Sequence, residues 1–235
     1  MIKNIPFEIT ENDTLQTLFT KTGAYSLEQH ENLESIILDK EYEIDFNNGI
    51  ISFGNDLKFN FKILGTLSAE SEKWHWAYDD EDVGFSKDLL TDAFKIKDFG
   101  EEFNISHFKR SLFDASIREA HILAMTSSVL LGANSYYVAD FDEIYFFLTI
   151  YSDEIKGENS AKRFIMTYDT FQKAYNTEIS PMMALEGYAN LKGYEYKESL
   201  YDENDKFSVV KINDSRIIVG FTERGNVSHI QTFIE

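Results

Sequence analysis

Apolar residues follow a helical spacing in some stretches of the chain and a strand-like alternation in others. In residues 12–40 they recur every three or four positions, which is typical of a helix with one buried face. Gly23 lies within that stretch, so we expect two helices there, the second one capped by Ser26. In residues 42–78 apolar and polar residues alternate instead, which predicts strands.

The strands expected in residues 42–78 begin with a hairpin. Two short apolar runs flank Asn47, Asn48 and Gly49, a combination that favours a tight turn between antiparallel strands. The sequence LKFNFKI, residues 57–63, then alternates strictly, as expected of an antiparallel strand with one buried face. The sequence EKWHWAY, residues 72–78, is expected to be the neighbouring strand.

Helical spacing returns in residues 86–131. Ser86 is placed to cap a first helix, and Gly100 lies where that helix is expected to stop. The strongest helical pattern of the chain runs from about Ser111 to Leu131. Gly132 follows it as a stop signal.

Alternation in residues 134–151 predicts two more strands, with Asp140, Asp142 and Glu143 in the turn between them. The polar segment 153–163 is the best candidate for a linker. Beyond it we expect one or two helices in residues 167–192, with Pro181 in a first turn, and then a four-strand meander.

These elements predict an α+β fold, in which helices pack on antiparallel sheets. We expect an N-terminal α+β domain in residues 1–152, with helices in 12–40, strands in 42–78, helices in 86–131 and strands in 134–151. A C-terminal α+β lobe, with helices followed by the meander, is expected in residues 160–235.

The chain is strongly acidic, with a net charge of −19. Its acidic residues are spread along the sequence, 23 before residue 119 and 18 from there on, which indicates an acidic surface rather than an acidic tail. Such a surface repels nucleic acids and anionic membranes, and it attracts basic proteins. Solubility alone is a sufficient alternative explanation of the charge.

The absence of cysteine excludes disulfides, thiolate catalysis and cysteine-based metal sites. The N-terminus lacks the basic start and apolar run of a signal peptide. The apolar stretch YVADFDEIYFFLTIY is interrupted by acidic residues too early to span a bilayer. We therefore expect a cytoplasmic protein without a membrane partner.

Both tryptophans lie in one short segment, where His75 separates Trp74 from Trp76. On a strand the two tryptophans share one face and His75 points to the other. Paired aromatic residues on a strand face usually pack in a core, but they can also line a ligand cleft. Core packing is the favoured interpretation.

An acidic run follows the tryptophans, formed by Asp79, Asp80, Glu81 and Asp82. A calcium loop needs Gly at its sixth position and Glu at its twelfth, and counting from Asp80 these positions hold Phe85 and Thr91. The run is therefore expected to be a solvated turn without a metal. Together with His75 it is the candidate contact surface for a protein partner.

No pattern of catalytic residues stands out. The five histidines are far apart and form no metal-binding pair on a helix; they are His30, His75, His107, His121 and His229. The segment GENSAK lacks the second glycine of a phosphate loop, and no nucleophile elbow or dinucleotide-binding motif occurs. We expect no cofactor and no metal.

One group of residues matches a known sequence pattern. It consists of Gly65, Ser68, Ser71, Trp74, Trp76 and Ala77, followed by Leu131, Gly132, Ala133, Tyr136 and Tyr137. Residues 40–152 thereby resemble a bacterial family of unknown function with a G-x-x-S-x-x-S-x-x-W-x-W-A core. The resemblance implies a small α+β domain, with Gly65, Trp74, Trp76 and Gly132 as its structural signature, and it implies no activity.

Three functions are compatible with these features. The first is a non-catalytic acidic binding protein, most consistent with an immunity protein that neutralises a basic bacterial toxin domain. The second is an enzyme or small-ligand module with a pocket near Trp74 and Trp76, and with His75 or His121 as an acid–base group. The third is a regulatory or scaffold interaction domain.

Overall fold

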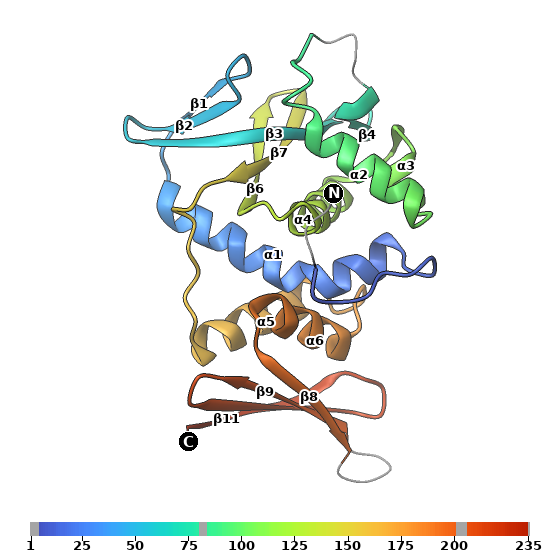
Figure 1. Cartoon of the computed structure of the whole chain (residues 1–235), viewed down its shortest axis with the longest axis vertical. Helices are drawn as coiled ribbons and strands as arrows, with labels where there is room; N and C mark the ends of the chain where they lie inside the picture. Colours follow the sequence, from blue (N-terminus) through green and yellow to red (C-terminus); the bar gives the residue numbers. More distant parts are fainter. Residues whose placement is uncertain (1–4, 80–83, 201–205, 235) are drawn as a thin grey trace. The chain divides into compact units, whose positions relative to one another are not determined.

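The computed structural model describes residues 5–79, 84–200 and 206–234 (Figure 1). The chain divides into two compact units. The N-terminal unit comprises residues 9–15 and 29–156, and the C-terminal unit comprises residues 5–8, 16–28 and 157–235. Helices and antiparallel sheets occur in both, so the predicted α+β class is confirmed.

The N-terminal unit is built on a seven-stranded antiparallel sheet. Its strands are β1 (Tyr42–Asp45), β2 (Ile50–Phe53), β3 (Leu57–Ser68), β4 (Lys73–Trp76), β5 (Leu112–Asp114), β6 (Ser135–Phe141) and β7 (Ile144–Tyr151). Its helices are η1 (Ala77–Asp79), α2 (Thr91–Glu102), α3 (Ser106–Lys109) and α4 (Ile117–Leu131). The expected hairpin at residues 47–49 is β1–β2, and the two strands expected in residues 134–151 are β6 and β7.

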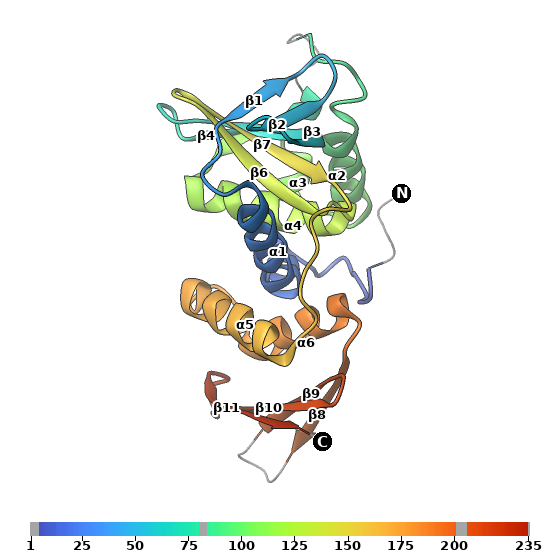
Figure 2. The same cartoon turned by 90° about the vertical axis from the view of Figure 1, so that its left-hand side faces the viewer.

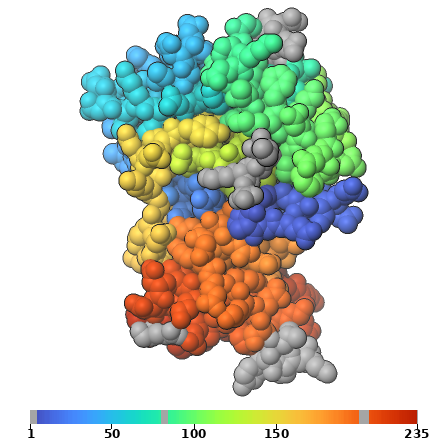
Figure 3. All heavy atoms as spheres, viewed as in Figure 1, coloured from blue at the N-terminus to red at the C-terminus, as the bar shows by residue number. Residues whose placement is uncertain are grey.

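Strand β3 is the centre of this sheet because its length lets it pair with three others. One edge pairs first with β2 and then with β4, and the other edge pairs with β7. The sheet curls, and the hydroxyl of Tyr42 on β1 donates to the carbonyl of Asp140 on β6 over 2.7 Å. In the space-filling view the yellow part of the chain, which includes β7, lies below strands β1–β3 (blue to cyan) and beside α2 (green) (Figure 3).

The two faces of the sheet bury different partners. On one face the strands bury their own aromatic residues within the curl, including Phe53, Phe59 and Phe61. The other face packs against α2 and α4, where Phe147 contacts Trp74 and His121. Burial of apolar area on both faces is the main stabilising contribution to this unit.

The C-terminal unit pairs helices with a four-stranded antiparallel sheet of order β11-β10-β9-β8 (Figure 2). The elements are α5 (Ala161–Tyr175), α6 (Pro181–Lys192), β8 (Glu195–Leu200), β9 (Lys206–Ile212), β10 (Ser215–Phe221) and β11 (Val227–Ile234). Pro181 is in the first turn of α6 after Ser180, as expected from its fixed backbone angle. The strands form the expected meander.

The prediction of two helices in residues 12–40 is wrong. A single helix, α1 (Leu15–Ile37), spans the stretch, and Ser26 is buried inside it. Gly23 does not end the helix because it is a site of close packing: a Cβ there would lie 2.5 Å from the Phe171 ring. Tertiary packing outweighs the roughly 1 kcal/mol helix penalty of glycine. Residues 16–28 of α1 belong to the C-terminal unit and residues 29–37 to the N-terminal unit.

Further boundaries differ from the sequence prediction. Helix α5 begins at Ala161, inside the segment expected to be a linker, after the cap Ser160. Helix α2 starts at Thr91 instead of after Ser86, and it continues through Gly100, where a Cβ would lie 2.6 Å from the Phe108 Cβ. The helix expected from Ser111 instead begins with strand β5, because residues 112–114 pair with β4. Helix α4 then starts after Ser116, which forms a capping box with Glu119.

Candidate functional site

The two tryptophans hold the sheet of the N-terminal unit to its helices. Both have no exposed surface, and their rings meet edge to face with centroids 5.0 Å apart. The Trp76 Nε1 donates to the carbonyl of His107 over 2.8 Å. Gly65 on β3 allows this packing, since a Cβ there would lie 2.8 Å from the Trp74 ring and 2.5 Å from the His75 carbonyl. Neither tryptophan is exposed to a ligand.

Gly132, the fourth residue of the implied signature, ends α4. Its φ of 69° lies in the left-handed region, which glycine adopts without steric cost. Its amide donates to the carbonyls of Ser128 and Val129, so the last turn of the helix is satisfied. The chain can therefore turn directly into β6.

His75 lies on the opposite face of β4 from the tryptophans, and that face is open. Cross-strand pairing places it in a row between Thr66 on β3 and Leu112 on β5. A second row joins Ile144 on β7 to Ser68, Lys73 and Asp114. We call this surface the open face; it consists of Thr66, Ser68, Lys73, His75, Leu112, Asp114, Phe141 and Ile144.

Three large apolar side chains of the open face are exposed to solvent. Leu112 is 50% exposed, Phe141 44% and Ile144 42%. Phe141 and Ile144 face each other across the β6–β7 hairpin. Leu112 lies on the other side of β3 and β4 from this pair. Single exposed apolar residues are ordinary, but several on one sheet face are typical of a contact surface.

Acidic residues surround this apolar group. The segments 68–73, 112–119 and 140–144 contain seven acidic and two basic side chains. The β3–β4 and β6–β7 turns meet where the amide of Ala69 donates to the carbonyl of Glu143 over 2.9 Å. A shallow cavity of about 320 Å³ beside them is lined by Glu72, Asp114 and Glu119. The open face therefore carries apolar side chains towards its two edges, Leu112 on β5 and the adjacent Phe141 and Ile144 on β6 and β7. Polar side chains of β3 and β4 lie between them, and acidic residues surround the face as a rim.

The candidate acidic run is only partly described. Asp79 is exposed, and its carboxylate lies 3.6 Å from the Nε2 of His75, so these two candidate residues are neighbours. Asp80, Glu81 and Asp82 lie outside the described residues. Leu112, Phe141 and Ile144 were not among the candidates, because the sequence pattern placed residue 112 in a helix, residue 141 in a turn and residue 144 in the strand that follows it.

The negative charge is concentrated in the first part of the chain. Residues 1–156 carry 29 acidic and 13 basic side chains, whereas residues 157–235 carry 12 and 9. The acidic residues are thus spread along the sequence, but the excess of negative over positive charge is not. A basic partner would be attracted mainly by the N-terminal unit.

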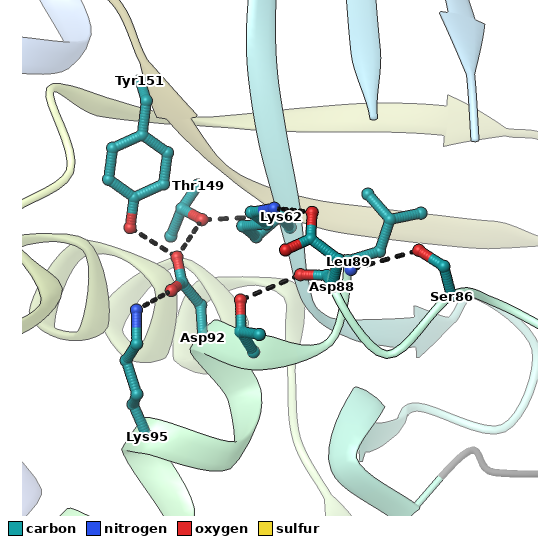
Figure 4. A network of polar contacts seen from close by, with 9 residues as sticks. Lys62, Ser86, Asp88, Leu89, Asp92, Lys95, Thr149 and Tyr151 are labelled. Atoms are coloured by element: carbon teal, nitrogen blue, oxygen red, sulfur yellow. Dashed lines mark hydrogen bonds and ion pairs between the residues drawn. The ribbon is translucent and has the colours of Figure 1, made fainter. Parts of the chain in front are cut away.

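A buried carboxylate fastens α2 to the sheet (Figure 4). Asp92, 1% exposed, accepts hydrogen bonds from the hydroxyls of Thr149 and Tyr151 on β7 and from the Nζ of Lys95. Burial and the Asp92 charge raise the pKa of Tyr151, so its hydroxyl stays protonated and continues to donate. Every oxygen of this carboxylate is satisfied, which identifies a structural anchor in the first turn of α2.

Two histidines flank Tyr136 on the helix-covered face. The ring of His30 stacks on that of Tyr136 with centroids 4.7 Å apart, and the Nδ1 of His121 lies 3.0 Å from the Tyr136 hydroxyl. Burial lowers the pKa of both histidines, and the nearby His30 further lowers that of His121. The nearby Glu34 opposes the shift at His30. Both imidazoles are thereby held neutral at pH 7, where neither carries a proton to donate as an imidazolium.

The described part of the chain holds no group of three or more histidine, aspartate or glutamate side chains arranged to bind a metal ion. Within the same residues, no helix is long and apolar enough to cross a membrane. These findings leave the open face as the surface of the N-terminal unit with the clearest functional character.

Comparison with known proteins places the chain in a family without assigning it an activity. No curated protein and no solved structure matches it. A family model described as a family of unknown function, DUF6882, matches residues 16–151. That match covers more than half of the chain and includes the glycine–tryptophan core and all seven strands of the first sheet. The chain therefore belongs to the DUF6882 family.

Proposed function

We propose that the N-terminal unit is a non-catalytic binding module whose open face contacts a basic protein. The observation that carries this proposal is that Leu112, Phe141 and Ile144 are exposed on one sheet face that acidic residues surround. Protein interfaces commonly combine apolar contacts with polar and charged ones. The rim's charge selects a basic partner and speeds its association by electrostatic steering.

The more specific form of the proposal is neutralisation of a toxin domain. A domain that attacks nucleic acid is often basic, and an acidic binder covers the surface through which it meets phosphates. An immunity protein does this by binding alone, so it needs no catalytic residues. The satisfied Asp92 network and the neutral, partly buried His30 and His121 are consistent with a protein that binds without chemistry.

Co-expression tests this form of the proposal. The chain is produced together with a basic protein encoded by a neighbouring gene, and growth and co-purification are measured. We expect the chain to restore growth and to co-purify, with binding that weakens as salt increases because the rim is exposed. Failure to protect cells from such a protein, combined with failure to bind it, would contradict neutralisation.

An open-face variant separates specific binding from general charge attraction. Ile144→Asp adds a negative charge beside Phe141, so it leaves steering intact while removing the apolar contact. We expect it to weaken binding by about tenfold or more. Met166→Asp is the matched control, since Met166 is a similarly exposed apolar residue on α5 in the C-terminal unit. Equal effects of the two variants would show that the open face is not the contact surface.

A further inference from the structure

The four-stranded sheet of the C-terminal unit has two unlike faces. Against one face lie α5 and α6 (Figures 1 and 2), and the side chains of Val210, Ile217 and Val219 are buried there. No described element of this unit covers the other face. Its cross-strand rows are Glu195–Lys211–Arg216–Phe233, Lys197–Val209–Ile218–Gln231 and Ser199–Phe207–Gly220–His229. We call this surface the cationic face.

Positive charge gathers on this face in an otherwise acidic chain. Among the described residues of these rows, Lys197, Lys211 and Arg216 are basic, and only Glu195 is acidic. The Glu195 carboxylate pairs with the Nζ of Lys197 at 2.5 Å. This ion pair and the Lys197 charge lower the pKa of Glu195, and Lys211 adds to the effect. Basic side chains therefore outnumber acidic ones in the described rows, in a chain whose net charge is −19.

Apolar and aromatic side chains lie between these cations. Phe207, Val209 and Ile218 are half-buried although none of the described elements of the unit packs on them, and Phe233 is exposed on the edge strand β11. A sheet face that is only solvated usually carries polar side chains in these positions. The combination of apolar and cationic rows is therefore suited to a partner that is both apolar and acidic.

One end of the cationic face is hollowed into a groove of about 460 Å³. Lys206 and His229 lie at this groove with Phe207, Ile218, Gly220 and Gln231. The His229 ring lies directly over Gly220, where a Cβ would come within 2.2 Å of the imidazole Cε1. A bulge in the pairing of β10 with β11 at Gly220 and Phe221 places Ser228 beside His229, with Oγ 3.0 Å from Nδ1.

The volume of the groove is within the range of small-ligand pockets, so it can receive one or two side chains of a peptide. Its floor is apolar, and Lys206, His229 and Gln231 supply donors around it. A peptide with a carboxylate near a bulky apolar side chain would match both the donors and the apolar floor of this groove. The other rows of the cationic face likewise place basic side chains beside apolar ones.

We propose that the cationic face binds an extended, acidic segment of a protein partner, with one of the segment's apolar side chains in the groove at Gly220 and His229. The matching charge is the argument for this occupant: the partner's carboxylates would meet Lys197, Lys206, Lys211 and Arg216. Single-stranded nucleic acid fits less well, because it brings a phosphate with every nucleotide and no aliphatic side chain for the groove or for Val209 and Ile218.

Fluorescence anisotropy on the full chain tests this proposal. The probe is a labelled peptide of about twelve residues in which glutamates are interspersed with leucine and phenylalanine. We expect saturable binding that weakens with salt, and no comparable binding of the same peptide with lysine in place of glutamate. Binding of a labelled single-stranded RNA of similar length is measured as a third comparison. The proposal is overturned if the acidic peptide binds no better than the lysine peptide, or if the RNA binds more tightly.

Substitutions then locate the site. Arg216→Glu is expected to weaken peptide binding by about tenfold. Lys173→Glu on α5 changes the charge of the same unit equally and should leave binding within about twofold, because Lys173 lies away from the cationic face and pairs with Asp169. Phe233→Ser on the edge strand is a second variant for the case that Arg216→Glu does not fold, as judged by circular dichroism.

Equal peptide binding by the folded Arg216 or Phe233 variant and by the unaltered chain would show that the peptide does not use this face. The outcome is independent of the open face, since the two surfaces belong to different units. Failure of one proposal therefore leaves the other intact.

Discussion

His75 on β4 pairs across the sheet with Leu112 on β5, and this pair lies on the face opposite to Trp74 and Trp76. One strand thus serves two purposes. Its inward side chains fix the sheet to the helices, and its outward side chains belong to a surface that remains available for contact. The two roles can be altered separately, because successive strand residues point to opposite faces.

The role of the outward side chains as a contact surface is tested at Leu112. We expect Leu112→Asp to reduce protection of cells from a co-expressed basic partner, because it replaces an exposed apolar side chain of the open face with a charge. The unfolding midpoint in urea should change little, since a half-exposed side chain on a short edge strand contributes less than a core residue. Loss of protection together with a large loss of stability would indicate misfolding instead of a lost contact.

The role of the inward side chains in fixing the sheet to the helices is tested by a matched pair of tryptophan substitutions. Trp76→Phe removes the donor to the His107 carbonyl, whereas the Trp74 Nε1 is buried without a hydrogen-bond partner. Both changes remove a similar volume, so their difference reports the hydrogen bond. We expect Trp76→Phe to lower the free energy of unfolding by about 1–2 kcal/mol more than Trp74→Phe. Urea unfolding of the two variants measures this, and equal losses would contradict the assignment.

Asp92 and Asp88 provide a second matched pair in one short segment. Asp92→Ala leaves the hydroxyls of Thr149 and Tyr151 without their acceptor in a buried site, and we expect a loss of about 2–4 kcal/mol. Asp88 also forms an ion pair, with Lys62, but its side chain is 80% exposed. Asp88→Ala should therefore cost about 0.5 kcal/mol or less. Thermal and urea unfolding measure the stability of the two variants. Similar losses of unfolding free energy would show that burial does not decide how much each carboxylate contributes to stability.

The two buried histidines predict that stability decreases in mild acid. Their pKa values in the folded protein are lowered by burial below the ordinary value of 6.5, so the unfolded chain binds more protons than the folded one. Their contribution is complete above pH 6.5 and is lost as pH decreases through the lowered values. We expect the urea midpoint to decrease between pH 7.5 and 5.5.

Substitution at His121 identifies the source of this pH dependence. His121→Asn retains a polar group near the Tyr136 hydroxyl but cannot be protonated, so the decrease should be smaller in this variant. His229→Asn, an exposed position on β11, is the control. An unchanged pH profile in His121→Asn would place the acid sensitivity elsewhere.

Much of the fold could be predicted from local patterns. The alternation in residues 57–63 belongs to a strand, and Trp74 and Trp76 share a buried face as their spacing indicates. The α+β class, the β1–β2 and β6–β7 hairpins and the C-terminal meander also follow from short-range signals. Turn residues and alternation act within a few positions, so a single sequence displays them.

Other features depended on contacts between distant residues. Gly23 and Gly100 resemble helix stops in the sequence, but each allows an aromatic residue far along the chain or in the next element to pack closely. Residues 112–114 have a helical pattern, yet they form β5 because β4 offers a hydrogen-bonding edge. Local propensity is a small energy that such packing and pairing readily exceed.

The sequence by itself determined the period of most elements, the acidity of the protein and the pairing of the tryptophans on one face. Only the tertiary structure decided which exposed residues lie together: His75 with Leu112 on the open face, and Lys211 with Arg216 on the cationic face. The physical reason is that surfaces are formed by strand register across long sequence separations. A sequence records the side chains of each strand, but not which neighbouring strand it will pair with.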